Sequence, residues 1–151
     1  MEESMKNFFL KGKIAGITPV SVYENKVYTQ NITVELEDGT KIEVYDPLKR
    51  CKKDMEGKIK NIRIRASTVQ PIIKNEKREM KIIPFNKASH ADIYGYIEKI
   101  LPNKPENLVI LKFGLGEIVL FADDKQIESL SEKDYVVTSA NLYLDEINDA
   151  K

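Results

Sequence analysis

Apolar and polar residues alternate along residues 32–46, and the pattern predicts one antiparallel β-hairpin. The apolar members of the alternation are Ile32, Val34, Leu36, Ile42 and Val44. A period of two gives each strand one buried face and one solvated face. Asp38-Gly39 lies between the two runs and predicts a two-residue turn, because both central positions of such a turn require positive φ.

The same pattern returns in the second half of the chain. Four positions recur at an offset of 83, where Gly12, Ile14, Ile17 and Pro19 match Gly95, Ile97, Ile100 and Pro102. Five positions recur at an offset of 76, where Ile32, Val34, Ile42, Val44 and Tyr45 match Leu108, Ile110, Ile118, Leu120 and Phe121. Alternating aliphatic residues and turn residues occur in any β-meander. The fixed offsets nevertheless favour a duplicated unit over two unrelated meanders.

Further elements are predicted around the two hairpins. Pro19 is predicted to end a first strand, so that residues 20–31 form a long connection with a strand extension over residues 27–29. Asp46-Pro47 has the residues of a helix start, an N-cap and a first-turn proline. Apolar residues at helical spacing follow this start and precede Gly57; they are Leu48, Cys51 and Met55.

The second hairpin is also followed by a predicted helix. It begins at Asp123 or Asp124, with Ile127 and Leu130 directed inward. Strands are predicted over residues 58–66 and 135–144, and the sequence leaves the register between these two strands open. Residues 70–89 connect the two halves and predict either closing strands or a further hairpin. The predicted domains are residues 8–87, which include the basic segment, and the shorter repeat at residues 91–147.

The order of three strands, a short helix and a strand resembles the OB-fold, a partly open five-stranded barrel. The glycine in the first strand and the tight turn between the second and third strands also match it. The resemblance implies an all-β fold with short helices, in which two related small OB-like barrels pack together. An SH3-like barrel has a similar strand pattern. OB-folds bind single strands or oligosaccharides, or hold proteins together, so the resemblance names no single function.

The composition of the 151-residue chain restricts its cellular location and excludes some kinds of site. Cys51 is the only cysteine, which excludes an internal disulfide and a cysteine-rich zinc site and favours a cytoplasmic location. The start, MEESMKNFFL, holds only a three-residue apolar run, so no signal peptide is predicted. No apolar run approaches the ~18 residues of a membrane span.

Charge is the sharpest functional feature of the sequence. Residues 49–87 carry 13 basic and four acidic residues, whereas residues 1–48 and 88–151 have net charges of −3 and −6. A basic groove with nearby aromatic rings holds single strands without sequence preference. The first hypothesis is therefore a non-enzymatic module that binds single-stranded DNA or RNA. The predicted contact residues are Lys49, Arg50, Lys52, Lys53, Lys58, Lys60, Arg63, Arg65 and Tyr45.

Plainer interpretations of the basic segment stay open. A lysine-rich segment is commonly a solvated face. The solvated side of the first hairpin carries Glu35, Glu37 and Glu43, which repel phosphate where an OB-fold usually binds its ligand. The basic segment can also dock on the acidic half, within one chain or between chains.

The second repeat suggests a different function class. Its two hairpin strands are apolar on both faces, and such strands are covered on both sides. Either the two halves pack together there, or the surface binds a protein partner or a second copy. The alternative hypothesis is thus a protein-interaction or scaffolding module. Its predicted contact residues are Val109, Leu111, Val119 and Phe121.

The remaining chemistry-bearing residues do not assemble a site. His90 lies in a polar loop, and His90 with Asp92 is too few ligands for zinc. Cys51 has basic neighbours that lower a thiol pKa, but its spacing favours a buried residue. Acidic residues around Asp123-Asp124 lack a calcium-loop spacing and fit N-capping better. No nucleophile–base–acid set is present, so we predict no enzyme, no metal and no cofactor.

Overall fold

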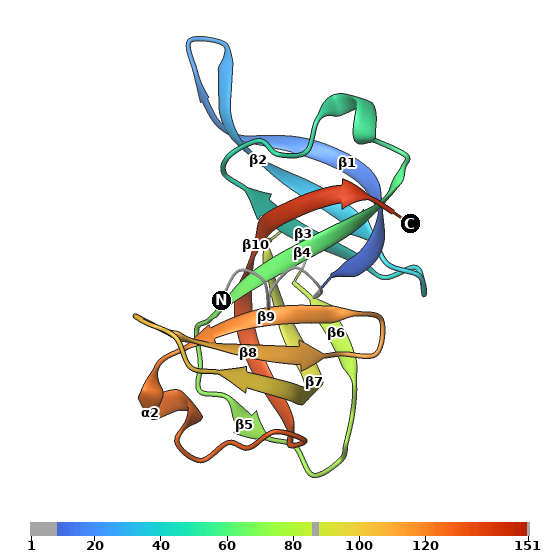
Figure 1. Ribbon diagram of the computed structural model, residues 1–151. Coiled ribbons are helices and arrows are strands. Elements are labelled where there is room, and N and C mark those ends of the chain that lie inside the picture. Colours follow the sequence, from blue (N-terminus) through green and yellow to red (C-terminus); the bar gives the residue numbers. More distant parts are fainter. Residues whose placement is uncertain (1–8, 86–87, 151) are drawn as a thin grey trace.

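The computed structural model describes residues 9–85 and 88–150, and its strands build two barrels (Figure 1). The strands are β1 (Leu10–Tyr23), β2 (Lys26–Glu35), β3 (Lys41–Asp46), β4 (Ile59–Thr68), β5 (Ile73–Lys74), β6 (Lys81–Pro84), β7 (His90–Leu101), β8 (Asn107–Lys112), β9 (Glu117–Ala122) and β10 (Tyr135–Asp149). The described part also contains a 3-10 turn, η1 (Lys53–Met55), and a short helix, α2 (Asp124–Ile127). No described helix has the length and apolarity that crossing a membrane requires.

The first barrel is closed by a strand from the other end of the chain. β2 lies between β1 and β3, and β1 also pairs with the start of β4. The second half of β10 then fills the gap between β3 and β4. Tyr143 pairs in parallel with Tyr45, and residues 142–149 pair antiparallel with residues 60–66. The resulting strand order is that of an OB-like barrel.

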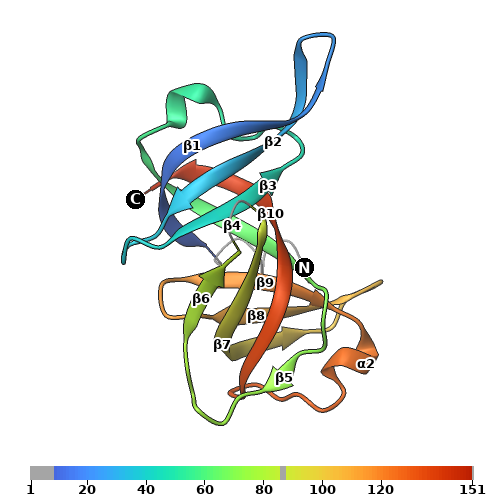
Figure 2. The same cartoon turned by 180° about the vertical axis from the view of Figure 1, so that it is seen from behind.

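The second barrel is built in the same way and borrows its last strand from the first repeat. β8 lies between β7 and β9, and β7 pairs with the first half of β10. Residues 65–67 of β4 pair in parallel with β9. Figure 2 shows the long β10 running from one barrel into the other. The predicted ranges 8–87 and 91–147 therefore each supply strands to both barrels.

The pairing confirms the predicted fold of two related OB-like barrels. Gly12 lies opposite Lys60 in the first barrel, and Gly95 lies opposite Val136 in the second. These pairs fix the register that the sequence left open, because Lys60 and Val136 are now equivalent at an offset of 76. A Cβ on Gly95 would lie 2.5 Å from the Lys112 carbonyl oxygen, so this strand coils as tightly as its glycine allows.

The register of β8 corrects the sequence alignment by one residue. Ile32 pairs with Val44, and Val109 pairs with Leu120, the residue equivalent to Val44. The equivalent of Ile32 is therefore Val109 and not Leu108. A one-residue shift exchanges the two faces of a strand, so the buried faces of β2 and β8 match only in the corrected alignment.

The two hairpin loops explain the shift. The Leu36 N–H donates to the Thr40 carbonyl at 2.8 Å, around a three-residue loop in which Gly39 has a φ of 90°. The predicted two-residue turn at Asp38-Gly39 is therefore one residue too short. In the second repeat the Phe113 N–H donates to the Gly116 carbonyl at 3.2 Å, so this loop has one residue fewer.

The helix predicted from Asp46-Pro47 does not form. Asp46 ends β3, and residues 47–52 make a loop before the short η1 turn. Leu48 is 69% exposed, so its helical spacing with Cys51 was misleading, although Cys51 is buried as predicted. The helix predicted after the second hairpin is confirmed as α2, where the Asp123 carboxylate accepts from the Gln126 N–H at 2.8 Å.

The segments before and between the repeats also differ in detail from the prediction. β1 continues through Pro19 to Tyr23 and β2 begins at Lys26, so the predicted long connection consists of two strands joined by a turn at residues 24–25. Between the repeats, β5 pairs with β10 and β6 pairs with β7, which supports closing strands over a further hairpin.

Candidate functional site

Opposite charges of the two halves meet where β4 and β10 pair. The Lys60 Nζ lies 2.5 Å from the Asp149 Oδ1. The Arg63 Nε lies 2.7 Å from the Asp145 Oδ2, and its Nη2 lies 3.0 Å from the Glu146 Oε2. Two predicted contact residues of the basic segment are therefore neutralised by the acidic half of the same chain.

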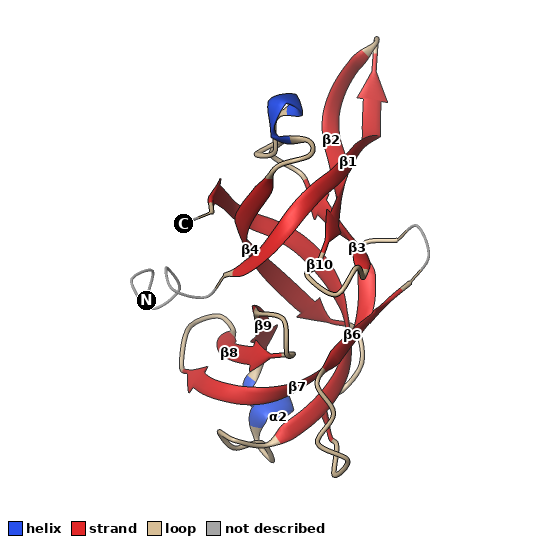
Figure 3. Cartoon of the chain, turned by 90° about the vertical axis from the view of Figure 1, so that its right-hand side faces the viewer, coloured by secondary structure: helices blue, strands red, loops and turns tan. Residues whose placement is uncertain are grey.

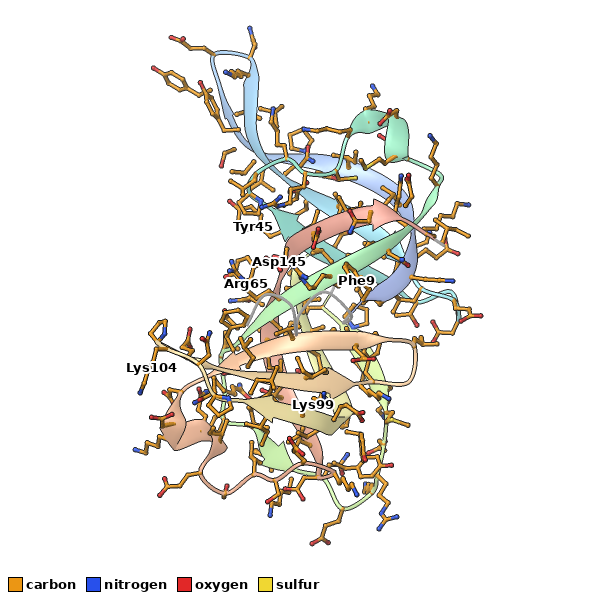
Figure 4. The ribbon with its side chains drawn as sticks, viewed as in Figure 1. Phe9, Tyr45, Arg65, Lys99, Lys104 and Asp145 are labelled. Atoms are coloured by element: carbon orange, nitrogen blue, oxygen red, sulfur yellow. The ribbon has the colours of Figure 1, made fainter. Side chains whose placement is uncertain are left out.

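Arg65 and Tyr45 pack against aromatic rings at the junction of the barrels. The Arg65 guanidinium lies 5.3 Å from the Phe121 ring centroid and 5.8 Å from that of Tyr143. The Tyr45 ring meets the Tyr143 ring edge-on at 6.1 Å. Figure 4 shows Tyr45, Arg65 and Asp145 on the same side of this junction. Cation–π contacts of this kind stabilise the junction by about 0.5–1 kcal/mol each at exposed sites.

The four residues predicted to bind a protein partner lie on different faces. Val109 and Leu111 are fully buried in the main core. Val119 is also fully buried, but on the opposite face of the hairpin with Leu108 and Ile110, and Phe121 packs at its border. The one-residue shift of β8 separates these residues, because it turns Val109 and Leu111 inward.

Three further predicted basic residues, Lys49, Arg50 and Lys52, lie on the loop after β3, which a buried carboxylate holds in place. The Asp46 side chain is fully buried and accepts from the Arg50 and Cys51 N–H groups, each at 2.9 Å. It also accepts from the Gln30 Nε2 at 2.9 Å, and this amide donates to the Cys51 carbonyl at 2.9 Å as well. The carboxylate thereby satisfies the loop backbone and directs basic side chains outward.

A pocket of about 430 Å³ opens between this loop and the end of β10. The loop contributes Leu48, Arg50 and Lys52, and β10 contributes Glu146, Ile147 and Asn148. The Glu146 carboxylate is held by Arg63, and within the described chain neither Arg50 nor Lys52 forms an ion pair. The Lys52 Nζ donates to the Lys49 carbonyl at 2.8 Å, which leaves its positive charge uncompensated. Lys53 and Lys58 are exposed and do not line the pocket.

His90 and Asp92, which the sequence analysis judged too few for a zinc site, both lie on β7. His90 starts β7 and is half-buried, with its Nδ1 2.8 Å from the Asn141 Oδ1, so it is not the solvated loop residue that the sequence indicated. The Asp92 carboxylate accepts from the Ser139 hydroxyl. No group of three or more His, Cys, Asp or Glu residues suited to a metal ion occurs in the described ranges.

Burial raises the pKa of the Cys51 thiol to about 11, with a further contribution from the nearby Asp46 carboxylate. A pKa about two units above the ordinary value of 9.0 leaves roughly 100-fold less thiolate at a given pH. We expect the native protein to react with a disulfide reagent at pH 8 about 100-fold more slowly than the urea-unfolded protein. The neutral thiol stabilises the fold below pH 9, and this contribution is lost as the pH rises toward 11. Equal rates in the native and unfolded protein would contradict this burial.

Comparison with known proteins bears on the fold. No family model and no curated protein sequence matches the chain. Among solved structures, the chain is similar to ModG, described as a cytoplasmic molybdate-binding protein, in a crystal form with molybdate bound. The TM-score is 0.53 and the sequences are 13% identical, over 99% of this chain and 100% of that chain. At this identity the likeness shows a shared fold.

This likeness overturns the function predicted from the sequence. ModG is described as binding molybdate, which is a small oxyanion. The geometry gives the physical reason, because Lys60 and Arg63 face carboxylates and Arg65 packs on aromatic rings. The hypothesis of a single-stranded nucleic-acid module is wrong. The scaffolding alternative is not supported either, because three of its four contact residues are fully buried.

The sequence missed the half of the pocket that β10 supplies. Its last strand was predicted to end at Leu144, whereas β10 continues to Asp149. Two consecutive polar residues, Asp145 and Glu146, follow Leu144 and break the alternation before Ile147. A register shift between Leu144 and Glu146 accommodates the extra residue, so strict alternation gave no signal for the end of this strand.

Proposed function

We propose that this chain is a binding protein for a small tetrahedral oxyanion, held in the pocket between residues 47–52 and β10. One observation carries the proposal. Arg50 and Lys52 line the same pocket, and its one lining carboxylate, Glu146, is already bound by Arg63 at 3.0 Å. Arg63 also binds Asp145, so Glu146 still counts as one negative charge in the lining. Neither Arg50 nor Lys52 forms an ion pair among the described residues, and the lining has a net charge of +1.

The two cations suit an oxyanion in different ways. The guanidinium of Arg50 is a planar fork that donates two parallel hydrogen bonds to oxygens of one anion. The ammonium of Lys52 acts as a compact charge with rotatable donors. Asn148 adds a neutral side-chain amide to the lining. Asp46 fixes the loop backbone before any ligand binds. The loop therefore loses little conformational entropy on binding.

The shared fold supports the same ligand class. ModG is described as binding molybdate and matches this chain over nearly the full length of both. We extend to this chain the class of ligand, tetrahedral oxyanions, and not molybdate in particular. We also propose that binding is not coupled to a reaction, since the neighbouring Cys51 thiol is buried and protonated. The cytoplasmic location stays a prediction.

Calorimetric titration at low ionic strength with molybdate, sulfate and phosphate tests the proposal. We expect saturable binding of at least one of these anions. Arg50→Gln is expected to weaken this binding at least tenfold, which corresponds to about 1.4 kcal/mol. Higher salt is expected to weaken it as well, because exposed charges are screened.

Lys53→Gln is the matched control. It removes one positive charge from the same segment but lies outside the pocket lining. We expect it to change affinity by about twofold or less, because its charge is exposed to solvent and outside the pocket lining. The proposal is wrong if none of the three anions binds, or if Lys53→Gln weakens binding as much as Arg50→Gln.

A further inference from the structure

The first repeat carries an arm that the second repeat lacks. The arm comprises residues 18–29, the outer parts of β1 and β2 and the turn between them. β1 pairs with β4 only as far as Lys13, and β2 pairs with β3 only from Gln30 onward. Between these limits the two strands pair with each other alone. Figures 1 and 3 show the arm projecting away from the first barrel.

Large apolar side chains are concentrated on this arm and are exposed. Val20, Val22, Tyr23 and Tyr28 have exposed fractions of 50%, 57%, 66% and 49%. A two-stranded ribbon without a covering layer is at best marginally stable in water. Contiguous exposed apolar residues mark interaction surfaces. The arm is therefore built to be covered by another surface.

The side chains of the arm, rather than its backbone edges, form this surface. Pro19 removes a hydrogen-bond donor from β1, and register shifts follow between Pro19 and Ser21 and between Ser21 and Val22. Proline and bulges are the devices that prevent an edge strand from pairing with another strand. The free part of β2 spans only Lys26 to Thr29. Strand addition is thus disfavoured on both edges.

A pocket that fits the tip of the arm lies at the opposite end of the same two strands. It has a volume of about 490 Å³, enough for a tyrosine side chain. Its apolar part is formed by Gly12, Leu36 and Ile59, and Ile59 is 61% exposed. Its lining also includes two lysines and two glutamates: Lys11, Lys13, Glu35 and Glu37.

The charges of the two surfaces are complementary. At the tip of the arm, Tyr23 is flanked by Glu24 and pairs with Lys26. The pocket lining offers the opposite sign to each of them, Lys13 for Glu24 and the two glutamates for Lys26. A flat apolar surface without these charges would give no reason to prefer one partner over another.

We propose that the arm of one copy inserts Tyr23 into this pocket of a second copy, and that the second copy returns the contact. Tyr23 pairs with Lys26 at one end of the β1–β2 ribbon, and Lys13 pairs with Glu35 at the other. When the ribbons of two copies lie antiparallel to each other, the arm of each copy therefore reaches the pocket of the other copy. This closes the assembly as a two-fold dimer. The surface is separate from the apolar strands of the second repeat and from the anion pocket.

A complementation experiment tests the proposal. Tyr23→Glu removes the arm contact and Ile59→Glu removes the pocket contact. Sedimentation velocity from micromolar to millimolar concentration is expected to show a dimer for the unaltered chain. Each variant alone is expected to dimerise at least tenfold more weakly. An equimolar mixture is expected to regain a heterodimer, because the intact arm of one variant meets the intact pocket of the other.

Val69→Glu is the matched control, since Val69 is similarly exposed but lies on neither surface. We expect it to leave the dimer unchanged, and thermal melts of all three variants check that they fold. A monomeric unaltered chain overturns the proposal. A dimer that survives Ile59→Glu, or a mixture that stays monomeric when both variants are folded, overturns insertion into this pocket.

Discussion

Deletion of residues 142–151 is expected to unfold the first barrel, although its other four strands remain in the chain. The deleted part is the strand that lies between β3 and β4. Leu142 and Leu144 are buried in the core, and loss of each removes about 1.5–3 kcal/mol of burial. Lys60 and Arg63 lose their carboxylate partners at the same time. The sum, with the lost backbone pairing, is comparable to the 5–15 kcal/mol that stabilises a typical domain.

Circular dichroism during urea unfolding and limited proteolysis measure the effect. We expect the truncated chain to lose its cooperative transition, with cleavage in β1 to β3 under conditions where the full chain resists. Deletion of residues 150–151 alone is the control, because it keeps Asp149 and its contact with Lys60. A truncated chain that unfolds at the same urea concentration as the full chain would show that β10 does not close this barrel.

Replacement of Asp46 by alanine is expected to lower the free energy of unfolding by about 3–5 kcal/mol. The buried carboxylate accepts three hydrogen bonds, from two loop N–H groups and the Gln30 amide. Each buried donor left without a partner carries a penalty of about 1–3 kcal/mol, partly relieved where water enters. Because Asp46 also fixes the loop that presents Arg50 and Lys52, anion binding is expected to weaken under conditions where the variant is still folded.

Urea unfolding followed by anion titration separates the two effects. Asp38→Ala is the control, since Asp38 also accepts a backbone hydrogen bond in a loop, from the Thr40 N–H at 2.9 Å, but is exposed. We expect a change of about 0.5 kcal/mol or less for this surface substitution. A loss below about 1 kcal/mol for Asp46→Ala would mean that the loop holds its shape without the carboxylate.

The general plan of the fold was accessible from the sequence because it is encoded in local patterns. Glycines at equal offsets mark the same coiled strand in both barrels, and Asp123 caps its helix as the residue type predicts. The one-residue error in β8 arose where the pattern is weakest. β8 and β9 are apolar on both faces, so the alternation of apolar and polar residues could not fix their register. The length of the loop between them decided it.

The exchange of strands between the barrels could not be predicted from the sequence, because no local pattern indicates which barrel a strand joins. β4 and β10 each look like one continuous strand, yet the first part of each closes one barrel and the second part the other. The pocket between residues 47–52 and β10 lies where residues almost a hundred positions apart meet, so only half of it could be predicted. The opposite net charges of the two segments did indicate one contact, since residues of the basic segment form ion pairs with residues of the acidic half.

The shared closing strands also set the order of events during protein synthesis. When β1 to β4 have left the ribosome, the first barrel still lacks the strand that ends at Asp149. Its aliphatic interior therefore stays partly open to solvent until β10 has been synthesised. Contacts between such distant parts of a chain form slowly. The nascent first half consequently passes through an aggregation-prone stage in which chaperones have a surface to hold.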